Sequence, residues 1–377
     1  MEVGLFLPVA TRGFLISTTS PPFDPTFDGI LKIVQRAEAA DLDFCLSMVK
    51  LHGFGGPSRY WDSCLDPFTT IAAALARTQK IKLFASVPIL AVPPAICARM
   101  SATIDSIAPG RFGLNIVTGW QKAEYDTMSM WPGESHSRRR YDYAAEYVAI
   151  LKELWQTGSC TFDGEFFQMH ECEVFPTPSS NIEIVCAGSS NEGMRFAAKL
   201  GDYNFIGLRE INSPLSITET TDRLMAASEA MGRKVGAYAL AMICADETAE
   251  IARARWIKYS EGADREAMAW ASGQLANDLS AAAKGDNSSS ADFKRATEMG
   301  MSGTAAGGEL SNAISMGMGA LIGSYSQVAQ MLDELATVDC VSGVMVALAD
   351  WHNDVDKFCK YVVPAMKSRA KGGAPRG

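Results

Sequence analysis

The chain has 377 residues, of which 47% are hydrophobic and 20% charged, and its formal net charge is −9. This composition supplies a large core and excludes a largely disordered protein. The acidic balance disfavours nucleic acid and anionic membranes as partners, since both carry negative charge. We therefore expect a globular protein whose partners include no nucleic acid and no membrane.

The N-terminus and the cysteines indicate a cellular compartment. The opening MEVGLFLPVA lacks the basic start and the long apolar run of a signal peptide. No run of about 18 apolar residues occurs, so no membrane span is expected. The nine cysteines are scattered singly without a C-x-x-C pair, as in proteins of a reducing compartment. The sequence thus predicts a cytoplasmic protein with reduced thiols.

Short apolar segments alternate with helical patterns along the chain. The predicted strands cover residues 3–8, 44–49, 81–87, 112–117, 182–186, 203–208, 238–245 and 343–348. The predicted helices cover residues 27–40, 67–78, 94–107, 139–156, 192–200, 214–231, 249–261 and 354–367. The strands are continuous apolar runs, which is typical of strands buried on both faces of a parallel sheet.

Eight βα units in a chain of this length favour an α/β fold, a (β/α)₈ TIM barrel formed by residues 1–377 as one domain. A doubly wound open sheet is the alternative, although no G-x-G-x-x-G follows the first strand. Residues 262–324 break the alternation and predict a long insertion before the last βα unit. It contains a polar turn at 280–290 and a Gly- and Met-rich run at 299–324. The insertion is either a lid over the active site or a plain surface excursion, and residues 369–377 are expected to be a flexible tail.

Residues at the ends of the predicted strands are candidates for chemistry, because barrel active sites lie at the carboxyl ends of the strands. Val49 and Lys50 end the second strand, Ser86 lies at the end of the third, and Asn115 interrupts the apolar fourth strand, which leads to Glu124. An unpaired buried amide costs about 1–3 kcal/mol. Either a ligand or neighbouring backbone would therefore partner Asn115.

A second set of residues predicts a phosphate site. The turn AGSS ends at Ser190, directly before a predicted helix, where free N–H groups and the helix dipole favour an anion. Arg140 and Tyr141 open the long helix and are candidates to clamp the same phosphate. The alternatives are an ordinary helix cap for the serine and a solvated basic turn for the arginines.

Other catalytic classes lack their motifs. The four histidines have no metal-binding spacing, and no G-x-S-x-G elbow occurs. We therefore expect no metal site, and an organic cofactor that carries a phosphate is the expected source of chemistry.

Several long segments resemble a known family. ATIDSIAPGRFGLNIVTGW and SRRRYDYAAEYVAILKELW resemble the bacterial luciferase-like flavin monooxygenases. GFLISTTSP, LSMVKLHGFGG, PPAICARMSATIDSI, NIVTGWQKAEYDTMSMWPG and VCAGSSNEGMRFA are more similar to the pyrimidine oxygenases of the Rut uracil-degradation pathway. The similarity is nearly collinear from residue 1 to about residue 368.

The resemblance implies a TIM barrel that binds reduced FMN supplied by a separate NAD(P)H:flavin reductase, with O₂ as co-substrate. We also expect a homo-oligomer. The family's flavin contacts correspond to Val49, Lys50, Asn115, Glu124, Arg140, Tyr141 and Ser190.

The reaction implied is the opening of the uracil or thymine ring at the N3–C4 amide, which gives a ureidoacrylate-type peracid. Ser86 and Asn115 would be the catalytic residues, and Leu46, Trp120 and the Met-rich insertion would line the substrate pocket. Ser86 stands where we expect Thr in this family. Two alternatives are the same flavin chemistry on another cyclic amide, a sulfone, a sulfonate or a halogenated aromatic, and a non-catalytic flavin-binding protein.

Overall fold

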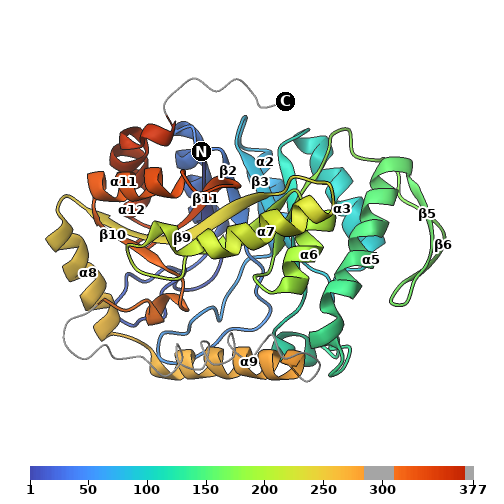
Figure 1. The fold of residues 1–377 in the computed structure, drawn as a ribbon, viewed down its shortest axis with the longest axis horizontal. Coiled ribbons are helices and arrows are strands. Elements are labelled where there is room, and N and C mark those ends of the chain that lie inside the picture. Colours follow the sequence, from blue (N-terminus) through green and yellow to red (C-terminus); the bar gives the residue numbers. More distant parts are fainter. Residues whose placement is uncertain (284–309, 370–377) are drawn as a thin grey trace.

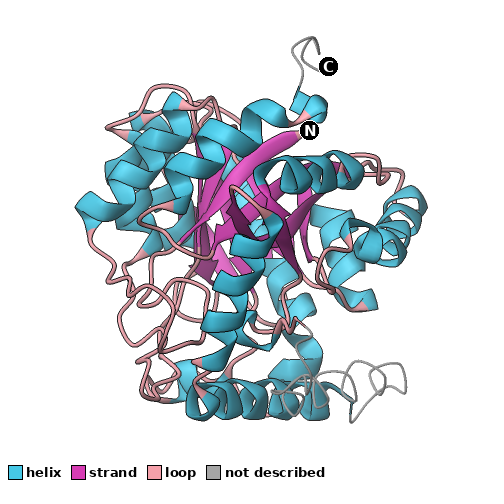
Figure 2. Ribbon diagram, turned by 90° about the vertical axis from the view of Figure 1, so that its left-hand side faces the viewer, coloured by secondary structure: helices cyan, strands magenta, loops and turns pink. Residues whose placement is uncertain are grey.

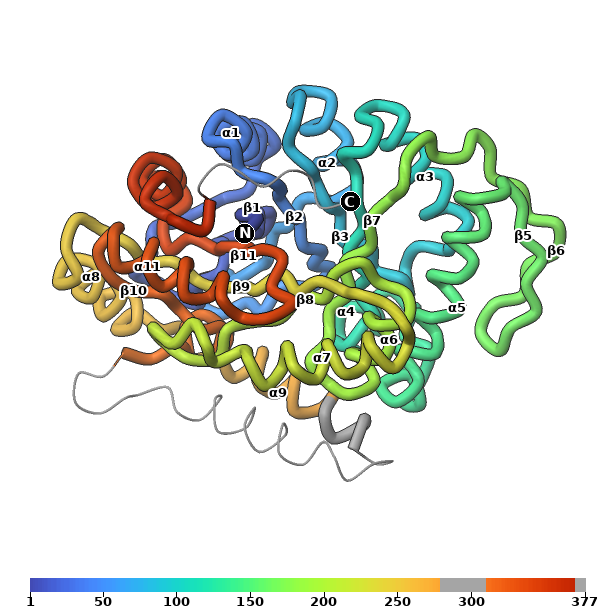
Figure 3. Tube along the Cα trace, turned by 45° about the horizontal axis from the view of Figure 1, so that its top comes forward, coloured from blue at the N-terminus to red at the C-terminus, as the bar shows by residue number. Residues whose placement is uncertain are grey.

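The computed structural model describes residues 1–283 and 310–369, and its centre is a closed barrel of eight parallel strands (Figures 1 and 3). The barrel strands are β1 (Glu2–Leu7), β2 (Phe44–Ser47), β3 (Lys82–Pro88), β4 (Phe112–Val117), β7 (Glu183–Ala187), β8 (Tyr203–Gly207), β9 (Gly236–Asp246) and β11 (Val341–Leu348). They pair in this order, and β11 closes the ring on β1. The predicted TIM barrel is confirmed, and the open-sheet alternative is wrong.

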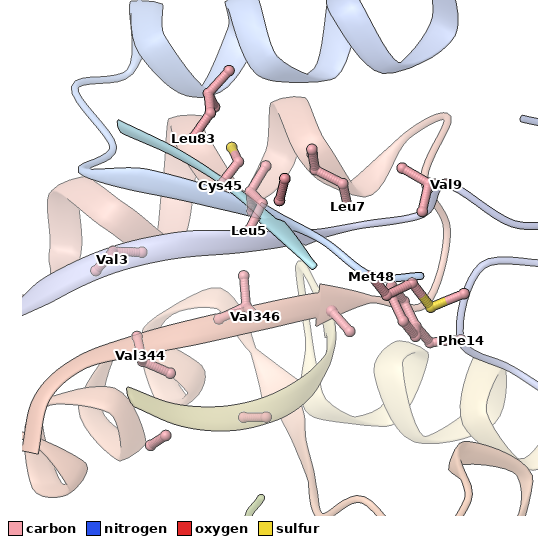
Figure 4. Close-up of a cluster of buried hydrophobic side chains, with 14 of the residues drawn as sticks. Val3, Leu5, Leu7, Val9, Phe14, Cys45, Met48, Leu83, Val344 and Val346 are labelled. Carbon is pink, nitrogen blue, oxygen red and sulfur yellow. The ribbon is translucent and has the colours of Figure 1, made fainter. Parts of the chain in front are cut away.

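Helices surround the barrel on its outer side (Figure 2). They are α1 (Phe27–Ala39), α2 (Pro67–Leu75), α3 (Pro94–Ile107), α5 (His136–Thr157), α6 (Asn191–Leu200), α7 (Thr218–Ala230), α8 (Ala249–Glu261) and α11 (Tyr325–Leu335). Side chains that point out of the strands, such as Leu5, Leu7, Cys45 and Leu83, are buried beneath these helices (Figure 4). Each strand is thus covered on both faces, which explains the continuous apolar runs in the sequence.

A separate cluster of large side chains fills the barrel interior. Its buried members are Phe44, Leu46, Phe84, Val185, Tyr238, Leu240 and Met345. The rings of Phe44 and Tyr203 stack on Tyr238, with centroids 4.3 and 4.2 Å away. These three residues lie near the amino ends of their strands. The amino-terminal half of the barrel is therefore packed with aromatic rings, and a ligand can enter only at the carboxyl end.

The region between α8 and β11 contains more regular structure than the sequence suggested. Helix α9 (Arg265–Ala283) lies across the carboxyl-terminal side of the barrel (Figures 1 and 2), and strand β10 (Ala320–Ser324) pairs with the second half of β9. The sequence analysis missed β10 because this five-residue strand directly follows a glycine-rich run. Residues 284–290 of the expected polar turn and residues 299–309 of the Met-rich run lie outside the described residues, whereas residues 310–324 of that run are described and end in β10.

Two further elements differ from the sequence-based prediction. An antiparallel hairpin of β5 (Ser159–Asp163) and β6 (Gln168–Glu173), which was not predicted, projects beyond α5 (Figure 3). The predicted terminal helix is only the single turn α12 (Asp354–Lys357), followed by π-helical and 3₁₀ turns. Pro364 explains why no α-helix continues beyond the π-helical turn, because proline removes a backbone donor and disfavours helix at the preceding residue. The expected tail after 369 lies outside the described residues, and in the described ranges no helix has the length and apolarity to cross a membrane.

Candidate active site

The two predicted catalytic residues meet inside the mouth of the barrel. Ser86 of β3 and Asn115 of β4 are register partners, and the Asn115 amide nitrogen donates to the Ser86 hydroxyl at 2.8 Å. Ser86 is fully buried. The Asn115 Oδ1 atom is also buried, and within the described part of the chain it has no hydrogen-bond partner. The alternative that neighbouring backbone satisfies this amide therefore fails for its oxygen, which remains available to a ligand.

A glycine beneath Asn115 explains how this pair is supported. Gly113 precedes Asn115 on the same inward face of β4, and a Cβ atom there would overlap the ring of Phe84. Phe84 in turn lies two residues before Ser86 on β3. The ring therefore forms a solid floor directly below the polar pair, because protein interiors leave little free volume.

A buried ion pair lies on another side of the mouth. The Lys50 Nζ atom is 3.0 Å from Glu124 Oε1, and the two side chains are only 4% and 8% exposed. Glu124 also accepts the backbone N–H of Leu51 at 2.9 Å, and the Lys50 ammonium donates to Gln121 Oε1. These contacts join the end of β2 to helix α4 (Lys122–Asp126), where Val49 is half-buried beside Lys50.

Three aromatic rings surround the Lys50 ammonium. The centroids of Phe54, Trp61 and Trp120 lie 4.7, 5.2 and 5.6 Å from Nζ, within the range of cation–π attraction. Burial lowers the pKa of Lys50, and the carboxylate of Glu124 opposes this shift. Trp120, which was expected to line the substrate pocket, faces Lys50 with its ring.

The predicted phosphate turn has the local geometry of a helix start. Ser190 is the N-cap of α6, and its hydroxyl accepts the Gly193 N–H at 3.1 Å. A Cβ atom on Gly188 or Gly193 would overlap the Tyr141 hydroxyl, so the absence of side chains lets Tyr141 approach the turn. The alternative that Ser190 is a helix cap is confirmed. The positive end of the α6 dipole and the Tyr141 hydroxyl both lie at this turn.

Two residues that the sequence analysis missed support this turn. Asn204 of β8 is fully buried and donates to the Gly188 carbonyl at 3.2 Å. Arg223 of α7 donates to the Ser189 carbonyl at 2.8 Å. Asn204 could have been found by the rule that selected Asn115, since it too is an amide in an apolar strand.

Arg140 lies at the first turns of α5 and is not part of a solvated basic turn. Its Nη1 atom donates to both carboxylate oxygens of Asp278 in α9, at 2.8 and 2.6 Å. The Arg140 and Asp278 side chains are 13% and 4% exposed. By contrast, Arg139 faces solvent and pairs with exposed carboxylates, as expected for a basic turn. No local sequence signal could have paired Arg140 with a residue 138 positions away.

Leu46 and part of the insertion, which were expected to line the substrate pocket, pack in the barrel interior. Leu46 is 1% exposed in the interior cluster, against which Phe6, Phe205 and Met318 also pack. Met318 belongs to the described end of the Met-rich run. These side chains give the mouth an apolar lining, which would exclude water from a ligand bound there.

His136 fixes the strand exit that carries Trp120. Its Nε2 lies 2.9 and 3.1 Å from the carbonyl oxygens of Thr118 and Gly119, and the side chain is buried. Burial lowers the pKa of His136, and the hydrogen bonds to these carbonyls oppose the shift. The lowered pKa favours the neutral imidazole, in which Nε2 carries the proton and donates it to these carbonyl oxygens.

This arrangement predicts a pH-dependent stability. Because the folded pKa of His136 is depressed, the unfolded chain takes up the proton first, so the stability held above about pH 6.5 is lost as the pH falls. The loss attributable to one such group is at most about 1.4 kcal/mol per pH unit. His136→Gln keeps an N–H donor without a titrating ring. Urea unfolding between about pH 5 and pH 7.5 should show a shallower decline for the variant than for the wild type, and equal slopes would contradict this assignment.

The side chains at this site offer hydrogen-bond partners that suit a flavin nucleotide. Buried atoms without partners in the described ranges include an acceptor, Asn115 Oδ1, and two donors, Gln121 Nε2 and Arg140 Nε. A flavin carries ring N–H and carbonyl groups and a phosphate, so it offers partners of both kinds. The start of α6, which the Tyr141 hydroxyl approaches, offers the helix dipole to the phosphate end.

The chain was then compared with known proteins. A model of the luciferase-like monooxygenase family matches residues 1–341. The chain belongs to this family. It is accordingly an oxidoreductase of the monooxygenase class.

Relatives within the family are similar over almost the whole chain. The pyrimidine monooxygenase RutA of Serratia proteamaculans (strain 568) is 46% identical over 98% of this chain and 96% of its own. The RutA protein of Caulobacter sp. (strain K31) is also 46% identical, over 98% of this chain and 99% of its own. The resemblance to pyrimidine oxygenases read from the sequence motifs is therefore confirmed.

Solved structures share the fold at lower identity. Riboflavin lyase (RcaE), solved with modified FMN and riboflavin, has a TM-score of 0.80 at 20% identity, covering 97% of this chain and 90% of its own. Long-chain alkane monooxygenase (LadA) has a TM-score of 0.76 at 18% identity, covering 97% and 90%. At these identities the likeness supports the barrel fold alone.

Proposed function

We propose that this protein is an FMN-dependent monooxygenase that opens the ring of uracil or thymine at the N3–C4 amide bond. The observation that carries the proposal is the buried Ser86–Asn115 pair, whose amide oxygen awaits a partner at the mouth of the barrel. The identity of 46% to RutA proteins, which are named as pyrimidine monooxygenases, supports the choice of substrate.

The cofactor would be held from both sides of the mouth. Ser190, Tyr141 and Arg140 would bind the phosphate at the start of α6. Val49, Lys50 and Glu124 would contact the flavin from the ends of β2 and α4, and Asn115 would face the ring system. Of these residues, Val49 and Lys50 follow β2, Asn115 lies in β4 and Ser190 follows β7, whereas the others come from α4 and α5.

Reduced FMN would supply the two electrons that activate O₂ at this site. In the net reaction one C4–O bond forms, the N3–C4 bond breaks, and the two hydrogens of the reduced flavin balance the peracid product. The Ser86 hydroxyl and the Asn115 amide would orient the reacting oxygen atoms and stabilise negative charge that develops on them. Leu46 and Trp120 would keep bulk water away from the pyrimidine.

The reduced cofactor would come from a separate NAD(P)H:flavin reductase. A direct assay would combine this protein, FMN, NADH, a flavin reductase, ¹⁸O₂ and uracil, and would follow products by mass spectrometry. We expect a product with the mass of uracil plus one O₂ and two hydrogens, carrying the isotope. Reactions without O₂, without reductase or without this protein are the controls.

A second candidate keeps the flavin and changes the substrate. Structural relatives include proteins named EDTA monooxygenase and long-chain alkane monooxygenase, so the fold accepts different substrates. The same assay with thymine, other cyclic amides, sulfones, sulfonates and halogenated aromatics separates the two. Persistence of uracil while another compound is oxidised would overturn the substrate, and tight FMN binding without any O₂-dependent turnover would favour a non-catalytic flavin protein.

Ser190→Ala tests the phosphate end. The variant loses the N-cap, which costs about 1 kcal/mol, and we expect about tenfold weaker FMN binding as the turn loosens. Thr248→Ala is the matched control, because Thr248 caps α8 by accepting the Ile251 N–H at 3.3 Å. The control should lose similar stability and keep its FMN affinity in fluorescence titrations. Equal FMN affinities for the two variants would remove Ser190 from the phosphate site.

A further inference from the structure

Helix α9 contacts both halves of the proposed cofactor site. Near its beginning, Trp270 stacks on His52 with ring centroids 5.4 Å apart and lies 4.9 Å from the ring of Phe54. Phe54 is one of the rings around Lys50. Toward its end, α9 supplies Asp278 to Arg140. The helix therefore spans from the Lys50 side of the mouth to the start of α5 (Figure 1).

The Arg140–Asp278 contact uses one part of the guanidinium. Both carboxylate oxygens of Asp278 accept from Nη1. The Nε atom of Arg140 is buried and has no partner within 1–283 and 310–369. The neighbouring Tyr141 ring, 5.4 Å from the guanidinium carbon, approaches the Gly188 turn through its hydroxyl. A guanidinium has five N–H donors in a fixed planar fork, so it can donate to a second anion while Nη1 donates to Asp278.

We infer that Asp278 is a positioning residue: it holds Arg140 by Nη1 so that the Nε edge remains directed at the phosphate of a bound flavin nucleotide. This inference rests on the proposed function. Without Asp278, the Arg140 side chain would have to become ordered when the ligand binds. The loss of its rotamer entropy would weaken binding. The buried carboxylate also keeps the cation in place while the phosphate is absent, because an unpaired buried charge is costly.

The opposite role is chemically possible and gives the opposite sign. If Asp278 and the phosphate competed for the same donors, the carboxylate would have to leave before the cofactor could bind. Neutralising Asp278 would then strengthen FMN binding. The positioning role requires that the same change weaken it.

The experiment titrates Asp278→Asn with FMN and with riboflavin, which lacks the phosphate, and follows flavin fluorescence. We expect about tenfold weaker binding of FMN, since charge-assisted hydrogen bonds are about twice as strong as neutral ones, and unchanged binding of riboflavin. Asp278→Glu restores the carboxylate and should recover part of the FMN affinity. The matched control is Asp142→Asn, which removes an exposed partner of Arg139 on the same helix as Arg140.

Each other outcome overturns the inference. Unchanged or tighter FMN binding by Asp278→Asn would reject positioning. An equal loss for FMN and riboflavin would mean that Asp278 only holds α9. If the wild type bound both flavins equally, the phosphate would not lie at Arg140, although the proposed flavin function would stand. If the wild type bound neither flavin, the proposed function would fail as well.

Discussion

Asn115→Ala should reduce turnover about 10²–10³-fold, the loss typical of removing one preorganised hydrogen-bonding group from a catalytic site. The change deletes the amide that donates to Ser86 at 2.8 Å and the buried oxygen that awaits a ligand. FMN affinity should change little, because the phosphate end at Ser190 is untouched. Steady-state kinetics with saturating reduced FMN, together with flavin titrations, measure the two effects separately.

A double-mutant cycle with Ser86→Ala is the control for this prediction. Since the two side chains share one hydrogen bond, their effects on turnover should be strongly non-additive, and the double variant should be little worse than Asn115→Ala. Additive effects would show that the residues act independently. A parallel fall of turnover and FMN affinity would instead mean that Asn115 only holds the cofactor.

Glu124→Gln should lower the free energy of unfolding by about 3–5 kcal/mol, the usual cost of leaving one partner of a buried ion pair uncompensated. The substitution keeps the shape of the side chain and an acceptor for Leu51, but it removes the charge that lies 3.0 Å from Lys50. Urea unfolding at pH 7 measures the loss. Asp356→Asn is the matched control, because the Arg36–Asp356 pair is exposed and should be worth less than about 1 kcal/mol.

The deficit of Glu124→Gln should shrink as the pH rises. Burial lowers the pKa of Lys50, and without Glu124 the largest interaction that opposes this shift is lost. The unfolded chain then binds the proton more tightly than the folded one, so stability increases with pH up to the unfolded lysine pKa of about 10.4. A deficit that stayed constant from about pH 7 to pH 9.5 would contradict the buried charge as its cause.

The barrel could be predicted because its signals are local. A strand buried on both faces must be apolar throughout, and eight such runs appear in the right order with helices between them. All eight predicted strands are the barrel strands. Strand β10 and the β5–β6 hairpin were missed, since β10 is short and follows glycines, and the hairpin strands are largely exposed and lack an apolar pattern.

The site residues divide in the same way. Asn115 could be selected because a polar residue in an apolar strand needs a hydrogen-bond partner. Ser190 could be selected because a serine directly before a helix either caps the helix or contributes to an anion site there. Gln121 and Asp278 were not selected, because each is an ordinary polar residue in its local sequence. Only burial reveals them, at 0% and 6% exposure.

The sequence by itself determined the order of strands and helices, and hence which residues stand at the carboxyl ends of the strands. Only the tertiary structure decided which of them meet: Ser86 with Asn115, Lys50 with Glu124, and Arg140 with Asp278. The physical reason is that hydrophobic periodicity is a property of neighbouring residues, whereas these partners lie 29 to 138 positions apart. Closure of the barrel and the packing of α9 across its mouth bring them together.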